Sequence, residues 1–149
     1  MVSNLVNIDA RLLVVFDGHC GLCNRAVRWL MKRDRRDRLR FAAFSSSAIA
    51  PLLARLDAIA PNTDSGPGSI LVVRDAGGPA EEMLLRTTAV LAVLAELPHP
   101  WPAIAAAFRW IPRPVRDLAY RLVARWRYRI WGRLSSCPIP TPEEQRQFL

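Results

Sequence analysis

The sequence lacks the long apolar stretches that a membrane span or a secretory signal requires. Its first apolar run, Leu12–Phe16, is five residues long and ends at Asp17, so it is too short for either kind of segment. We therefore expect the protein to stay in the cytoplasm. The chain has 149 residues, of which 51% are hydrophobic, and this is enough for one hydrophobic core but not for two separate ones.

Cysteine and histidine are scarce, which limits the metal sites that the chain can form. There are three cysteines and two histidines, and only Cys20 and Cys23 have the Cys-x-x-Cys spacing. A structural zinc site needs four ligands and usually takes them from two such pairs. Zinc is therefore a minor alternative, in which the pair would recruit the remaining candidates, His19, His99 and Cys137. We expect neither a metal nor another cofactor.

Lysine occurs once, at Lys32, so arginine supplies nearly all of the formal net charge of +8. Such a balance permits binding to nucleic acid, anionic membranes or acidic partners. No helix-turn-helix, zinc knuckle or aromatic RNA-binding motif accompanies the charge, and we expect no nucleic-acid binding.

Over the first 98 residues, apolar runs of strand length alternate with amphipathic segments. We expect strands at Leu12–Phe16, Leu39–Phe44, Ile70–Val73 and Met83–Leu85. Helices are expected after the first and the second strand, and a third helix after the fourth strand, capped by Thr87 or Thr88 and stopped by Pro98. This order predicts an α/β protein with a mixed sheet flanked by helices, in which residues 1–98 form the core.

Residues 99–149 differ in composition, since they carry four of the five tryptophans among many arginines. We expect this part to be a helical extension packed on the core, within one domain overall. The apolar positions Val115, Leu118, Leu122 and Trp126 recur at helical spacing, so we expect them to face the core while the arginines face solvent. The alternative is a non-enzymatic protein whose basic helices contact a membrane surface or a partner.

The Cys20 and Cys23 pair stands at the start of an amphipathic helix, and this position favours thiol-disulfide exchange. That reaction needs a thiolate nucleophile and a second thiol that resolves the mixed disulfide. Free amides at the helix N-terminus stabilise a thiolate at Cys20, which we expect to be open to solvent. Cys23 lies on the apolar stripe with Ala26, Val27 and Leu30, so we expect it to face the core, to remain protonated and to resolve.

Two side chains before the pair have more than one possible role. Asp17 either relays a proton to or from Cys23 or accepts hydrogen bonds from backbone amides in an Asx turn, and the two roles are compatible. A cationic His19 favours a thiolate at Cys20, but a histidine at this position is equally typical of an exposed turn.

The segment Asp17-Gly18-His19-Cys20-Gly21-Leu22-Cys23, followed by a basic amphipathic helix, resembles the DCC family of predicted thiol-disulfide oxidoreductases, named for its Asp, Cys and Cys. The C-terminal half resembles the same family at Pro112–Asp117, Tyr120, Ala124, Arg127–Arg129, Gly132 and Cys137–Pro138. Members are mostly bacterial and are grouped with thioredoxin-like folds. The resemblance implies such a fold, exchange with protein or small-molecule thiols and disulfides, and Asp17, Cys20 and Cys23 as catalytic residues.

Thioredoxins place a cis-proline immediately before the third strand, where it faces the disulfide. Here Pro67 lies three positions before Ile70, the expected start of that strand, and Ser69 takes the expected place. The substrate-binding residues are therefore not predicted. Cys137 is expected to be a spare or packed thiol rather than a third redox centre.

Overall fold

The computed structural model describes residues 12–59, 70–75, 80–132 and 141–148. Within them, four strands form one sheet: β1 (Leu12–Phe16), β2 (Leu39–Ala43), β3 (Leu71–Arg74) and β4 (Glu82–Leu85). The strand order is β2-β1-β3-β4, in which β1 runs parallel to β2, and β3 runs antiparallel to both β1 and β4. The predicted mixed sheet is confirmed, and each strand agrees with its expected range to within one residue at either end.

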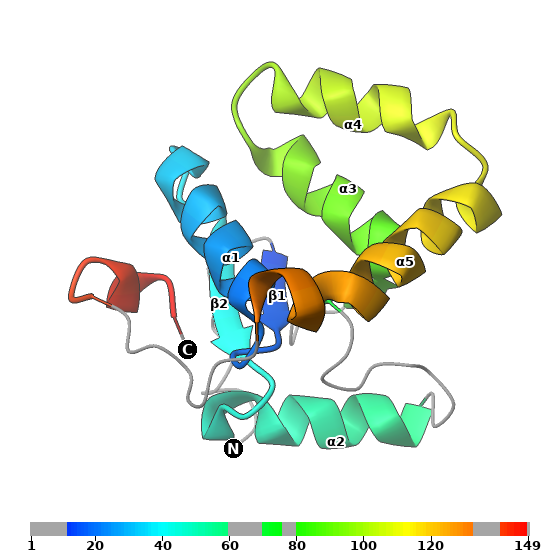
Figure 1. Cartoon of the computed structure of the whole chain (residues 1–149). Helices are drawn as coiled ribbons and strands as arrows, with labels where there is room; N and C mark the ends of the chain where they lie inside the picture. The colour runs from blue at the N-terminus through cyan, green and yellow to red at the C-terminus, as the bar shows by residue number, and fades with distance from the viewer. Residues whose placement is uncertain (1–11, 60–69, 76–79, 133–140, 149) are drawn as a thin grey trace.

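Helices cover both faces of this sheet (Figure 1). The helix α1 (Gly21–Arg33) joins β1 to β2, and α3 (Arg86–Glu96) follows β4; both pack on one face. The helix α2 (Ala50–Ile59), preceded by a 3-10 turn at Ser47–Ile49, covers the other face. A mixed sheet with helices on both sides is consistent with a thioredoxin-like fold, as the sequence predicts.

β1 is the centre of the core because its residues are buried on both faces of the sheet. Side chains alternate across a strand, so Leu12, Val14 and Phe16 face α1 and α3, whereas Leu13 and Val15 face α2. An unbroken apolar run is therefore what this strand needs. The same burial holds the end of β1 rigidly in place, and Asp17 follows directly from it.

Two further helices follow α3. The helix α4 (Trp101–Arg109) packs on α3, and α5 (Arg113–Trp131) crosses α3 and α1, so that its end lies beside the start of α1 (Figure 1). A 3-10 turn follows at Glu144–Arg146, after which Phe148 bridges to Phe41 of β2. None of the described helices is both long and apolar enough to cross a membrane.

The inward face expected for α5 is wrong. All four residues of the expected stripe are exposed: Val115, Leu118, Leu122 and Trp126. The helix instead turns Asp117, Tyr120 and Arg127 toward the rest of the protein. The Thr87 hydroxyl donates to Asp117 at 2.6 Å, and the Tyr120 hydroxyl accepts the Ile70 N–H at 2.9 Å. Helical spacing identifies an apolar face, but polar contacts decide which face turns inward.

The expected cap of α3 is also wrong. Leu85 occupies the N-cap position and makes no side-chain hydrogen bond there. Thr87 lies inside the first turn, where its hydroxyl bonds to Asp117 of α5 rather than to a backbone amide of its own helix. A carboxylate is the stronger acceptor partner for this hydroxyl, and the contact ties α3 to α5.

Candidate active site

The turn between β1 and α1 is organised around the Asp17 carboxylate, which is buried. The His19 N–H donates to its Oδ1 at 3.0 Å, and the Cys20 N–H donates to the Asp17 carbonyl at 3.2 Å. These contacts are those of the Asx turn that the sequence allows. Asn24 closes the turn from the helix side, because its side-chain amide donates to the Gly18 carbonyl at 2.8 Å.

Cys20 is the N-cap residue of α1. Its backbone is extended, and its Sγ accepts a hydrogen bond from the Cys23 N–H at 3.4 Å. The sulfur therefore lies at the positive end of the helix, where an amide donor and the helix dipole both stabilise negative charge. The sequence predicts this position, at the N-terminus of the helix, for Cys20.

The expected exposure of Cys20 is wrong, since the residue is 0% exposed. The start of α1 is covered by the far end of α5: the Gly21 N–H donates to the Gly132 carbonyl at 3.4 Å. Local sequence around the motif carries no information about a segment more than a hundred residues away. That local sequence predicts Cys20 at the start of the helix, where the structure has it as the N-cap, and misses what lies over it.

Cys23 is half-buried, one turn into α1. Burial, the hydrogen bond to Cys20 and the charge at Cys20 raise the pKa of the Cys23 thiol to about 12. Burial is the largest of these causes, because it removes water from the charged form. Cys23 is therefore a protonated thiol at neutral pH.

Arg127 of α5 is a site residue that sequence reasoning did not single out. Its Nη2 lies 3.6 Å from Asp17 Oδ2, and both side chains are buried. The two charges act on Cys23 in opposite directions, since Arg127 lowers and Asp17 raises the pKa of the thiol. In the sequence Arg127 is one of several arginines in a basic helix, so only the family resemblance marked it.

A cavity of about 280 Å³ opens beside Cys23. Most of its lining is apolar and comes from β1, α1, α3 and α5. The lining includes Phe16, Leu22, Ala26, Val27, Val90, Val123 and Ala124. Tyr120 is a second residue that sequence reasoning did not select, and burial raises the pKa of its hydroxyl. The structure thus brings Asp17 and Cys23 to one cavity, together with Arg127.

Other candidates from the sequence are not gathered here. Among the described residues, no group of three or more histidine, cysteine or acidic side chains could hold a metal ion. His99 lies exposed in the connection between α3 and α4. Pro67, Ser69 and Cys137 fall outside the described residues.

Comparisons with known proteins identify relatives along most of the chain. A family model described as DCC1-like thiol-disulfide oxidoreductase matches residues 14–133. The chain is 30% identical over 137 residues to the protein named Uncharacterized protein YuxK of Bacillus subtilis, covering 92% of this chain and 93% of that one. It is 33% identical over 137 residues to a chloroplastic DCC family protein of Arabidopsis thaliana, covering 92% and 74% of the two chains. No solved structure matches.

Proposed function

Because the chain belongs to the family of DCC1-like thiol-disulfide oxidoreductases, we propose that it catalyses thiol-disulfide exchange with Cys20 as nucleophile and Cys23 as resolving thiol. The observation that carries this proposal is the hydrogen bond from the Cys23 N–H to Cys20 Sγ at the start of α1. This amide would also donate to a thiolate at Cys20, and Cys23 provides the neighbouring second thiol that exchange requires.

The choice between the two sulfurs rests on which one can be a thiolate. Burial and the neighbouring Cys20 raise the pKa of the Cys23 thiol, so Cys23 stays protonated at neutral pH and is the poorer nucleophile although it is the more exposed of the two. The amide donor and the dipole at the helix N-terminus stabilise negative charge at Cys20 Sγ. We propose that the contact between α1 and the end of α5 opens to admit substrate to this buried sulfur.

The proposed reaction proceeds in two exchanges. The Cys20 thiolate attacks one sulfur of a substrate disulfide, forms a mixed disulfide and releases the first substrate thiolate. Cys23 then loses its proton and attacks Cys20 Sγ, which forms the Cys20–Cys23 disulfide and releases the second thiolate. The protein is oxidised by two electrons and the substrate is reduced to two thiols. The reverse sequence oxidises a dithiol substrate.

Asp17 is proposed to take up the proton that Cys23 releases. Its carboxylate lines the same cavity as the Cys23 thiol, and its charge acts on that thiol. Arg127 is a positioning residue, because its contact with Asp17 Oδ2 holds the carboxylate at the cavity wall. The second exchange is slow without such a base, since the high pKa of Cys23 keeps its thiolate rare.

The proposed substrates are thiols and disulfides of proteins or small molecules. The cavity beside Cys23 is lined mainly by apolar side chains, and this favours an apolar group next to the reacting sulfur. The cytoplasmic location expected from the sequence stays a prediction. The chain has three cysteines, and two of them form a redox-type pair. This pattern is not that of a structural disulfide framework, and it agrees with a reducing compartment.

The test uses three single substitutions and a chromogenic aromatic disulfide. Cys20→Ser is expected to abolish multiple turnover and the first exchange. Cys23→Ser is expected to attack once and stall as a mixed disulfide that mass spectrometry detects. Cys137→Ser, the same change outside the motif, is the control and retains activity. Trapping at Cys23 in the Cys20→Ser protein, at the wild-type rate, would reverse the proposed roles.

A further inference from the structure

The exposed large apolar side chains that the structure describes are confined to one region. Among the described residues, every large apolar side chain that is exposed lies on α4, on α5 or between them. These residues are Phe108, Trp110, Val115, Leu118, Leu122, Val123, Trp126 and Ile130. Trp110, at the corner between the helices, is 90% exposed. A group of exposed large apolar side chains of this kind marks an interaction site.

Basic side chains run beside this apolar surface along α5. Leu118, Leu122, Trp126 and Ile130 recur every four residues, as do the exposed Arg121, Arg125 and Arg129. Residues three or four apart lie side by side on a helix, so the two sets form adjacent rows. The Arg129 guanidinium lies 5.1 Å from the ring centre of Trp126 and links the rows.

The charge of the region has one sign. Residues 101–132 contain seven arginines and a single carboxylate, Asp117. That carboxylate accepts the Thr87 hydroxyl and lies 3.7 Å from the Arg113 guanidinium, so it offsets one arginine and leaves the positive charge of the region in large excess. The surface therefore complements a partner that carries many negative charges.

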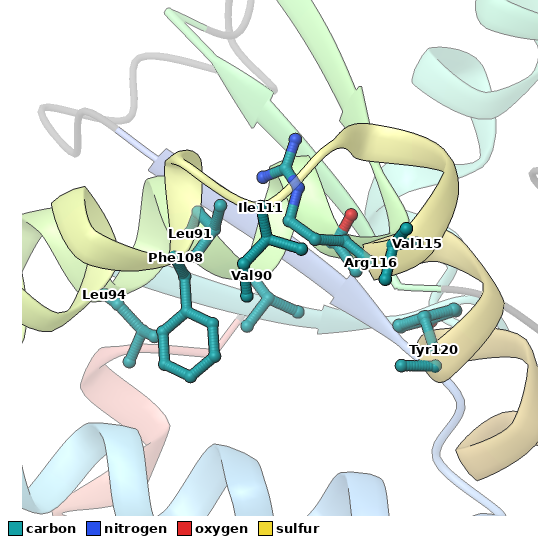
Figure 2. Close-up of a pocket in the computed structure, with 10 residues that line it drawn as sticks. Val90, Leu91, Leu94, Phe108, Ile111, Val115, Arg116 and Tyr120 are labelled. Atoms are coloured by element: carbon teal, nitrogen blue, oxygen red, sulfur yellow. The ribbon is translucent and has the colours of Figure 1, made fainter.

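An apolar hollow lies behind the same region (Figure 2). Its volume is about 360 Å³, and α3, α4 and α5 each contribute apolar side chains, among them Leu94, Phe108 and Val115. Arg116 stands at its edge, and its Nε is buried without a hydrogen-bond partner in the part of the chain that the structure describes. A hollow lined by apolar side chains with an arginine at its edge suits an acyl chain joined to an anionic headgroup.

We propose that α4 and α5 dock the protein on an anionic lipid bilayer. The apolar row and Trp110 enter the boundary between headgroups and acyl chains, and the arginine row binds lipid phosphates. Tryptophan and arginine together are typical of helices that lie in this interface. The expectation that the apolar stripe of α5 faces the core is wrong, and the exposed stripe is therefore available to contact lipid.

Two other partners fit the surface less well. A second copy of the chain in a twofold contact would bring the same arginine rows against each other, and like charges repel. A nucleic acid would neutralise the arginines but would leave the apolar row and Trp110 in water. A bilayer with acidic headgroups satisfies both rows at once.

The test is flotation of the full-length protein with vesicles at physiological salt. The protein is expected to float with phosphatidylglycerol-containing vesicles, to stay behind with pure phosphatidylcholine, and to detach as salt is raised. Arg121→Glu combined with Arg125→Glu is expected to weaken binding at least tenfold. Arg35→Glu combined with Arg36→Glu makes the same charge change at exposed residues after α1 and is expected to retain nearly all of the binding.

A second pair of variants tests Trp110 and the apolar row. Trp110→Ala and Leu122→Asn are expected to reduce binding at every salt concentration, with unchanged melting temperatures. Absence of flotation would overturn the proposal, as would equal loss in the two charge-reversal variants. A concentration-dependent dimer abolished by Leu122→Asn would assign the surface to a second copy. The protein that carries both Arg121→Glu and Arg125→Glu is expected to exchange a soluble disulfide at the wild-type rate. A failure of membrane binding is thereby distinguished from a failure of the redox proposal.

Discussion

The helices α1 and α5 look alike in the sequence and differ in the structure. Both are amphipathic and rich in arginine. In α1 the apolar residues Val27 and Leu30 are buried against the sheet, as expected. In α5 Leu122 is 51% exposed and Trp126 46%, although both stand on an equally regular apolar stripe. A helical stripe thus shows that an apolar face exists and does not show what the face meets.

The difference follows from what each helix is attached to. α1 leaves a fully buried strand through a short turn and returns into the parallel strand β2, so one face has to cover the sheet. α5 is joined to α4 through residues 110–112 and has no strand directly before it. Its position is set by polar contacts, chiefly those of Tyr120 and Arg127. Such contacts leave the apolar face free for a partner.

The largest expected effect compares the same substitution in the two helices. Leu30→Ala removes a buried side chain and leaves a cavity, so it is expected to lower the free energy of unfolding by about 3 kcal/mol. Leu122→Ala is expected to change it by less than about 0.5 kcal/mol. Urea denaturation measures both. Equal losses would show that the apolar row of α5 is covered in solution, and would remove the contrast.

A smaller effect is expected from the polar contacts that hold α5. Arg127→Met leaves the buried Asp17 carboxylate without its cation, and is expected to cost about 2 kcal/mol of unfolding free energy. The loss exceeds that of Leu122→Ala in the same helix, although arginine is the more polar residue. Arg127→Lys, which keeps the charge, is expected to recover part of it. If Arg127→Met leaves the free energy of unfolding unchanged, the ion pair does not position α5.

The smallest effect is a pH dependence located at α1. The pKa of Cys23 is raised to about 12 in the folded protein, whereas an unfolded thiol ionises near 9.0. The unfolded state therefore loses its proton first, and the stabilising contribution of Cys23 is complete below pH 9 and is lost between about pH 9 and 12. After allowance for partial exposure, wild-type stability is expected to fall by about 1 kcal/mol between pH 8 and 10 on this account.

The control for this pH dependence is Cys23→Ser, whose stability is expected to fall less steeply over the same range. Tyr120 also has a raised pKa because it is buried, so Tyr120→Phe separates the contribution of the phenol. Urea unfolding midpoints from pH 8 to 10 measure all three proteins. Parallel curves for the wild type and Cys23→Ser would contradict the coupling of this thiol to folding.

Local physical chemistry was sufficient for the strands, the helices and the position of Cys20 at the start of a helix. An unbroken apolar run forms a strand that is buried on both faces, and an apolar stripe at helical spacing forms a helix. Residues 17–23 then place one cysteine at the helix N-terminus and the other one turn inside. These features depend on neighbours within a few residues, and the sequence displays those neighbours directly.

Contacts between distant segments decided the rest. Gly132 lies over the start of α1, Arg127 reaches Asp17, and Tyr120 meets Ile70, and each contact joins residues at least fifty positions apart. They enclose Cys20, add a cation to the site and rotate α5 so that its apolar row faces outward. A periodic pattern defines the faces of a helix, but packing and buried polar partners select the face that turns inward.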